Sequence, residues 1–244
     1  IIFGNLIEKL RYGENPHQSA ALYSSNQTND LIQLSGKQLS YNNYNDIYSG
    51  LLLSKSFKKK KATVIIKHAN ICGASENISK TKSFLNSLAC DPVSAFGGVV
   101  ICNFKIDKKT SLEISKIFFE VIVANGYDKN ALKILKNKKN LRIIDSSKVN
   151  LVRSNNFVSL FNNFLYQSSD NEIFDKKNFH VVSKRKPSKK LFEDLIFSFN
   201  ICRYVKSNAI VLSKDKSTVG IGAGQPSRFD SCQIAVEKME RFFI

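Results

Sequence analysis

Short runs of β-branched and other apolar residues recur along this 244-residue chain, and stretches with helical spacing of apolar side chains separate them. Strands that alternate with helices form α/β sheets, because each intervening helix covers one face of the sheet. The sequence therefore predicts an α/β fold. The expected strands are residues 20–23, 64–67, 99–103, 121–124, 141–144, 209–212 and 217–221. The expected helices are residues 44–57, 76–88, 111–119, 131–137 and 191–208.

A basic pair, Lys67-His68, follows the apolar run 64–66 and precedes Gly73. We expect a strand to end at this pair and the chain to turn through Gly73. Two basic groups would then lie at a strand's carboxyl end, where open α/β sheets bind ligands. A histidine there can move a proton near neutral pH, and an adjacent cation can stabilise negative charge. For the dipeptide alone, a solvated lysine and a structural histidine are the favoured alternative.

The segment LRYGENPHQSAALY, residues 10–23, packs many polar groups into a stretch broken by glycine and proline. This composition is typical of a loop, and loops often carry function. Arg11 suits phosphate oxygens, because a guanidinium forks onto them, and Tyr12 suits a planar ring that it can stack on. The alternative is an ordinary capped turn before a strand.

Two further segments are rich in glycine. In DPVSAFGGVVICN, residues 91–103, Gly97 permits close approach of the backbone to a ligand, or alternatively tight packing of a helix on a sheet. In SNAIVLSKDKSTVGIGAGQPSR, residues 207–228, a strand runs into three glycines and ends at Arg228. Gln225 replaces the third glycine of a dinucleotide motif, so the segment favours a simple anion site or only a hairpin exit.

The motifs LRYGENPHQ, KHANICG, DPVSAFGG and SNAIV, followed by GIGAGQPSR, occur in this order. Together they closely resemble the AICAR transformylase part of a bifunctional purine biosynthesis enzyme family. AICAR is aminoimidazole carboxamide ribonucleotide, and the other part of that enzyme is inosine monophosphate (IMP) cyclohydrolase. The resemblance implies cytidine-deaminase-like subdomains, with residues 1–145 as the first, 146–190 as a connector and 191–244 as the start of the second.

The resemblance also implies an activity and its participants. The expected reaction transfers a formyl group from 10-formyltetrahydrofolate to the 5-amino group of AICAR, in a cytoplasmic homodimer with active sites at the subunit interface. His68 is implied as the base and Lys67 as the oxyanion stabiliser. The residues implied to contact the ribonucleotide are Arg11, Tyr12, Gly97, Glu120, Asn208 and Arg228.

The residues by themselves bear on the implied role of Glu120 and on whether the implied fold holds zinc. Without the family, Glu120 would be interpreted as a surface glutamate at a helix end. The histidines and cysteines lack the H-x-E…P-C-x-x-C spacing of zinc deaminases, so no zinc is expected despite the implied fold.

The positions of the motifs set a further expectation. The first motif begins at residue 10, and the chain ends soon after the glycine-rich one. We therefore expect the IMP cyclohydrolase part and the end of the second subdomain to be absent, and formyl transfer to be impaired. The alternative is a non-catalytic chain that binds the ribonucleotide weakly.

The net charge of +17 raises a third possibility, a basic nucleic-acid-binding module. It ranks lower, because the lysine runs lack aromatic interleaving and a positive field can equally steer anionic substrates. The five cysteines form no C-x-x-C pair, which indicates free thiols in a reducing compartment. No apolar run approaches the roughly 18 residues of a membrane span.

Overall fold

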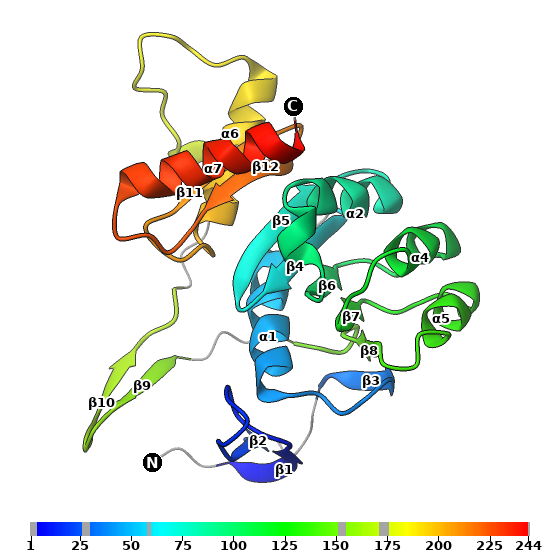
Figure 1. Cartoon of the computed structure of the whole chain (residues 1–244). Coiled ribbons are helices and arrows are strands. Elements are labelled where there is room, and N and C mark those ends of the chain that lie inside the picture. Colours follow the sequence, from blue (N-terminus) through cyan, green and yellow to red (C-terminus); the bar gives the residue numbers. More distant parts are fainter. Residues whose placement is uncertain (1–3, 26–29, 58–59, 151–154, 171–175, 244) are drawn as a thin grey trace.

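The computed structural model describes residues 4–25, 30–57, 60–150, 155–170 and 176–243. An eight-stranded mixed sheet with the order β11-β12-β5-β4-β6-β7-β8-β3 forms its centre (Figure 1). The α/β class predicted from the sequence is confirmed, whereas the cytidine-deaminase-like nature of the subdomains stays a prediction. The strands are β3 (Ile32–Ser35), β4 (Ala62–Lys67), β5 (Asn70–Glu76), β6 (Val99–Cys102), β7 (Val121–Ala124), β8 (Arg142–Asp145), β11 (Ile210–Lys214) and β12 (Ser217–Gly222).

Helices cover both faces of this sheet (Figure 1). On one face, Ile47 of α1 and Phe197 and Ile201 of α6 join an apolar cluster with strand residues. On the other face, Phe84 of α2 and Leu135 of α5 belong to a second cluster, which α4 completes. The two layers bury the strands from both sides, as the near-continuous apolar strand runs require. The helices are α1 (Tyr41–Ser56), α2 (Lys80–Ala89), α3 (Pro92–Ala95), α4 (Lys108–Ser115), α5 (Lys129–Lys136), α6 (Lys189–Cys202) and α7 (Arg228–Phe242).

The strand directions gather segments far apart in sequence at one edge of the sheet. Strands β6, β7 and β8 run parallel, and β4 runs antiparallel to β5 and β6. Because β12 is antiparallel to β5 and to β11, this edge holds the carboxyl ends of β4 and β12 and the amino ends of β5, β6, β7, β8 and β11. We call it the Lys67 edge. Lys67 ends β4 as expected, but the rule for carboxyl ends of parallel strands does not apply, because the parallel strands have their amino ends here.

Several local expectations were wrong. The turn after Lys67 does not run through Gly73, which lies within β5, where a β-carbon would stand 1.9 Å from the carbonyl oxygen of Ser87 in α2. The helix expected from residue 76 begins at Lys80, because Glu76 still belongs to β5 and Ser79 caps the helix. The helix expected to reach residue 208 ends at Cys202, and α7 was not expected at all.

Two hairpins stand beside the main sheet (Figure 1). One pairs β1 (Asn5–Leu10) with β2 (Ala20–Ser24), and the other pairs β9 (Asn156–Leu160) with β10 (Asn163–Gln167). The second hairpin and a 3-10 turn (Lys176–Asn178) fall in the expected connector 146–190, of which residues 151–154 and 171–175 lie outside the described part. The proposed subdomain boundaries stay a prediction, since β11 and β12 extend the same sheet as the earlier strands.

Candidate active site

A two-residue turn presents the basic pair at the end of β4. His68 and Ala69 join β4 to β5, with Lys67 paired to Asn70, and both turn residues have positive φ angles, 53° and 56°. A tight hairpin of this kind requires such angles, which are costly for residues other than glycine. The His68 side chain is exposed, and Lys67 is half-buried. The turn therefore directs the histidine to solvent at the Lys67 edge.

Lys67 lies against the glycine of the DPVSAFGG motif. Its Nζ donates to the carbonyl oxygen of Phe96 at 2.7 Å, and a β-carbon on Gly97 would lie 4.0 Å from the same nitrogen. The backbone N–H of Gly97 donates to Phe118 at 2.9 Å, and its φ of 73° suits glycine. An ammonium has three donors, so this lysine keeps protons for a ligand beside the glycine.

Glu120 precedes β7 and is held by two other elements. Asn43 of α1 donates from Nδ2 to the Glu120 carboxylate at 3.0 Å, and Arg142 at the start of β8 lies 3.8 Å from the same oxygen. Asn43 also accepts from Ser40 through Oδ1, completing a capping box at the start of α1. The carboxylate is thus fixed at the edge while 45% of its side chain stays exposed.

Arg142 connects this carboxylate to the first motif. Its side chain is 9% exposed, and its Nε donates to the carbonyl oxygen of Gln38 at 3.1 Å. Burial lowers the pKa of Arg142, Glu120 raises it, and the charge of Arg11 lowers it again. Arg11 in turn lies over the Tyr12 ring, 5.3 Å from its centroid. Gln38 also donates from Nε2 to the carbonyl oxygen of Lys9 at 2.9 Å, so the hairpin that carries Arg11 and Tyr12 is tied to the residue that Arg142 contacts. A guanidinium over a phenol ring suits an anionic group near an aromatic ring.

Asn208 and Arg228 form a second group at the same edge. Asn208 precedes β11, and its Nδ2 donates to the carbonyl oxygens of Gln225 and Pro226 at 2.9 and 2.7 Å. Ser227 caps α7, and Arg228 is the exposed first residue of that helix. Asn208 therefore shapes the glycine-rich loop after β12, and the loop places an arginine at a helix start.

The structure therefore divides the residues predicted for the site into two groups. Arg11, Tyr12, Lys67, His68, Gly97 and Glu120 gather around the ends of β4, β7 and β8. Asn208 precedes β11 and Arg228 begins α7, and within the described residues no hydrogen bond or ion pair joins the two groups. Strand order alone places both at the Lys67 edge.

Sequence reasoning missed three residues that shape the first group. Asn43 and Asp46 are buried polar residues on α1, three positions apart, and Arg142 is a buried arginine that begins a strand. Part of a signal was present in the sequence, because Ser40 is a residue type preferred at a helix N-cap. Nothing in the local sequence showed that the same side chains reach Glu120 and the β4–β5 turn.

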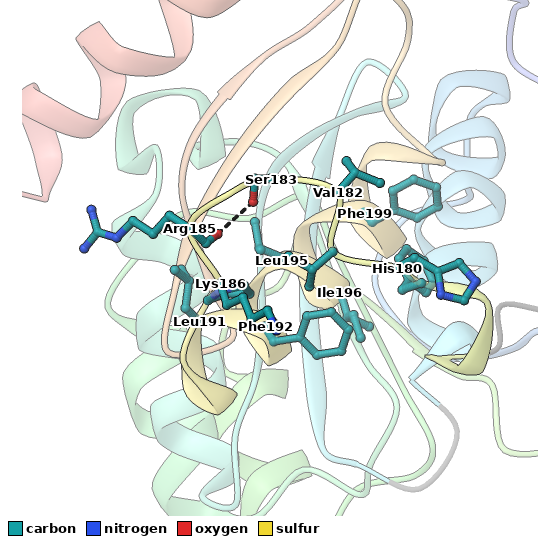
Figure 2. Close-up of a pocket in the computed structure, with 13 residues that line it drawn as sticks. His180, Val182, Ser183, Arg185, Lys186, Leu191, Phe192, Leu195, Ile196 and Phe199 are labelled. Atoms are coloured by element: carbon teal, nitrogen blue, oxygen red, sulfur yellow. Dashed lines mark hydrogen bonds between the residues drawn. The ribbon is translucent and has the colours of Figure 1, made fainter.

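A separate pocket of about 620 Å³ lies between α6 and the segment that precedes it. Figure 2 shows Phe192, Leu195 and Ile196 of α6 together with His180 and the Ser183–Arg185 hydrogen bond of 2.7 Å. None of the residues predicted for the site lines this pocket, so it is distinct from the Lys67 edge.

Two searches of the described residues gave negative results. Across the described ranges, no three or more His, Cys, Asp and Glu side chains group closely enough to hold a metal ion. In the same part of the chain, every helix is too short or too polar to cross a membrane.

Comparisons with known proteins identify the family. A family model described as the AICARFT/IMPCHase bienzyme matches residues 2–238. A protein of Prochlorococcus marinus (strain MIT 9515), named bifunctional purine biosynthesis protein PurH, is 45% identical over 245 residues, covering 95% of this chain and 47% of that protein. The protein of the same name from Chelativorans sp. (strain BNC1) is 44% identical over 245 residues, covering 97% and 46%. The chain thus spans about half the length of the curated relatives it matches. It belongs to the AICARFT/IMPCHase bienzyme family.

Proposed function

We propose that this chain carries the formyl-transfer site of a purine biosynthesis enzyme, which moves a formyl group from 10-formyltetrahydrofolate to the 5-amino group of AICAR. The single observation that carries the proposal is the Lys67 edge itself. It brings an ammonium and an imidazole to the end of β4, at the same sheet edge as the Glu120 carboxylate that Asn43 and Arg142 hold. A reaction between two anionic substrates that creates an oxyanion needs these groups.

The chemistry follows from the nucleophile. The amine of AICAR is conjugated with a carboxamide and is therefore weak. As it attacks the formyl carbon, a C–N bond forms and the amine must lose a proton, which the exposed His68 ring accepts. The oxygen of the tetrahedral species becomes negative beside the Lys67 ammonium. Collapse then breaks the bond to the folate nitrogen, which leaves with a proton returned by His68.

The other site residues would bind and orient the ribonucleotide. Arg11 and Arg228 supply charge-assisted hydrogen bonds to a phosphate or a carboxamide, and Tyr12 offers a ring face and a hydroxyl. The carboxylate of Glu120, held by Asn43 and Arg142, is placed to accept from ribose hydroxyls. Gly97 leaves room for a ligand beside Lys67.

We also propose that the protein is a homodimer, and the β9–β10 hairpin supports this. Residues 155–169 contain no charged side chain, although the chain carries a net charge of +17. Phe161 is fully exposed, and Phe164, Leu165 and Tyr166 are each about 60% exposed. An uncharged, apolar arm suits contact with a second copy, because it brings together no like charges of two basic chains.

The dimer proposal is tested by sedimentation of the protein extended to the length of its relatives. We expect Leu165→Asp to shift it toward monomer, since a charge would be buried at the contact. Val182→Asp is the matched control, because Val182 is 96% exposed and lies outside the hairpin. An unchanged dimer in the Leu165 variant would exclude the hairpin from the interface.

The cytoplasm is the proposed location, since all five cysteines are free and three of them are buried.

The proposed activity is tested by a steady-state assay of formyl transfer, with the 244-residue chain and the extended protein measured side by side. We expect transfer in the extended protein and far less in the shorter chain. Ribonucleotide binding without transfer in both forms would favour a non-catalytic binder, and salt-sensitive binding to DNA or RNA in place of AICAR would favour the nucleic-acid module.

A further inference from the structure

We propose that Asp46 is a positioning residue that holds His68 and its turn in the geometry that the base requires. The inference rests on the proposed function of His68 and on the position of the Asp46 carboxylate. Asp46 lies in α1, and its side chain reaches the β4–β5 turn. One oxygen accepts from the Ala69 N–H at 2.6 Å, and the other accepts from the His68 N–H at 3.3 Å.

These two hydrogen bonds fall on the two residues with strained backbone. His68 and Ala69 both have positive φ angles and neither is glycine, so the turn needs an external support. In a two-residue turn the N–H groups of both residues point away from the strand ladder and need acceptors of their own. Asp46 satisfies both at once, and its two oxygens match the two donors one to one.

The surroundings show that this carboxylate is committed to the turn. Asp46 is 8% exposed, although it sits close to the exposed His68. Burial raises the pKa of Asp46, and the hydrogen bonds from Ala69 and His68 and the nearby His68 charge lower it in part, while Glu120 raises it again. A carboxylate is costly to bury, so this position is tolerated only with strong local partners.

Asp46 and Asn43 each hold a different part of the site in place. They lie three residues apart on α1 and therefore on the same face of the helix. Asn43 donates to Glu120, and Asp46 accepts from the turn that carries His68. The first two turns of α1 thus set the positions of the proposed base and of the ribose-facing carboxylate relative to each other.

The role predicts a specific rescue. Asp46→Asn keeps the shape of the side chain but leaves only one acceptor for two N–H donors. The turn should then relax toward negative φ and move the His68 ring. Ala69→Gly removes the strain at one of the two turn residues, because glycine adopts positive φ without a steric cost. A carboxylate that acted directly on substrate would gain nothing from that second change.

The experiment uses the extended protein and four forms: the unmodified sequence, Asp46→Asn, Ala69→Gly and the double variant. Asn45→Ala is the matched control, since Asn45 is the exposed neighbour of Asp46 on the same helix. We expect kcat of Asp46→Asn to fall at least 10-fold with KM for AICAR within 2-fold, and the double variant to recover most of the loss. Ala69→Gly and Asn45→Ala should each stay within 2-fold.

A second readout does not depend on activity. Amide hydrogen exchange followed by NMR should show the His68 and Ala69 amides protected in the unmodified protein and exchanging at least 10-fold faster in Asp46→Asn. This readout keeps the inference testable if the protein proves inactive or if Asp46→Asn fails to fold, since protection in the unmodified protein is then decisive. Unprotected amides there, or a kcat loss that Ala69→Gly leaves unchanged, would overturn the proposal.

Discussion

Arginine side chains at the Lys67 edge differ in how far the structure fixes them. Arg142 is buried between Glu120 and the backbone of Gln38, whereas Arg228 is exposed at the start of α7. A buried guanidinium with fixed partners mainly holds the site in shape. An arginine at the surface is available to a ligand, so Arg11 and Arg228 are the residues whose loss should be seen most directly in binding.

Arg11→Ala and Arg228→Ala should each weaken ribonucleotide binding. A charge-assisted hydrogen bond contributes about 1.5–3 kcal/mol, which corresponds to a roughly 10- to 150-fold higher Kd. Calorimetric titration with AICAR measures this directly. Arg185→Ala is the control, since Arg185 is exposed and lines the separate pocket of Figure 2. An unchanged Kd in both variants would remove these arginines from the site.

At this scale the sequence predicted the residues that carry the chemistry but not those that position them. Lys67, His68 and Arg11 stand in long motifs with unusual composition. Asp46 and Asn43 stand in a helix outside the four motifs, and their partners are 22 to 77 positions away along the chain. Local patterns carry no information about such partners, because the contacts depend on how α1 lies across the sheet.

Glycines within elements, more than those in turns, set how closely helices approach the sheet. Gly73 in β5 lies under α2, and Gly222 in β12 lies under α7, where a β-carbon would stand 1.8 Å from the carbonyl oxygen of Ser231. Such approaches place the helix backbone directly on the strand. Gly73 and Gly222 are thus explained by packing, an alternative that the sequence suggested only for residues 91–103.

Gly73→Ala should destabilise the fold strongly, because the new methyl group would meet the backbone of α2, which cannot move alone. Overpacking of this kind costs about 1–3 kcal/mol or more in free energy of unfolding. Gly126→Ala is the matched comparison. Gly126 has a φ of 90°, and an added β-carbon there would make only an ordinary contact, 3.8 Å from Cγ of Lys105, so the substitution should cost only the backbone strain, about 1 kcal/mol.

Unfolding by urea measures both variants. A cost at Gly73 no larger than that at Gly126 would show that α2 can shift away from β5 and that the close approach has little energetic importance.

The elements that the sequence predicted well are the central parallel strands. Their apolar runs are long, fully buried and bounded by polar turns, as in 121–124, which matches β7. The sequence failed for β5, whose NICGASE lacks a continuous apolar run because Gly73 and Ser75 pack against neighbouring backbone and side chains. It also failed for α7, since Pro226 suggested a break where the structure shows that a helix begins two residues later.

An ion pair joins α7, the last helix of the described chain, to the residue that precedes α3. Lys238 of α7 lies 2.7 Å from the carboxylate of Asp91, whose side chain is only 3% exposed. Asp91 also caps α3, which leads to Gly97, by accepting from the Ser94 N–H at 2.9 Å. This pair therefore links the last helix to the loop that lies against Lys67.

Lys238→Met should lower the free energy of unfolding at neutral pH by about 1–3 kcal/mol, because it leaves a buried carboxylate without its cation. Lys133→Met, at an exposed position of α5, should change it by less than about 0.5 kcal/mol. Chemical denaturation of both variants is the measurement.

The pKa of Asp91 predicts how the stability lost in Lys238→Met depends on pH. Burial by itself raises the pKa of Asp91, but the hydrogen bonds from Lys238 and Ser94 outweigh it and hold the pKa below its ordinary value. The stability that Asp91 contributes is therefore present above the pKa of an unfolded aspartate, about 3.9, and is lost as the pH falls through the lower folded value. The deficit of the Lys238 variant should shrink below about pH 4, and a deficit independent of pH would show that the pair is not its cause.

The central claim for the whole molecule is that the end of β4 carries the chemistry of formyl transfer. The most direct test is the steady-state rate of formyl transfer to AICAR by the extended protein and its variants at these positions. His68→Ala should lower kcat by roughly 10²-fold through loss of the base. Lys67→Ala should lower it by about 10²–10³-fold through loss of the oxyanion stabiliser. His180→Ala and Lys129→Ala, at exposed positions away from this edge, should leave kcat within about 2-fold. Turnover close to that of the unmodified protein in either the His68 or the Lys67 variant would contradict the account.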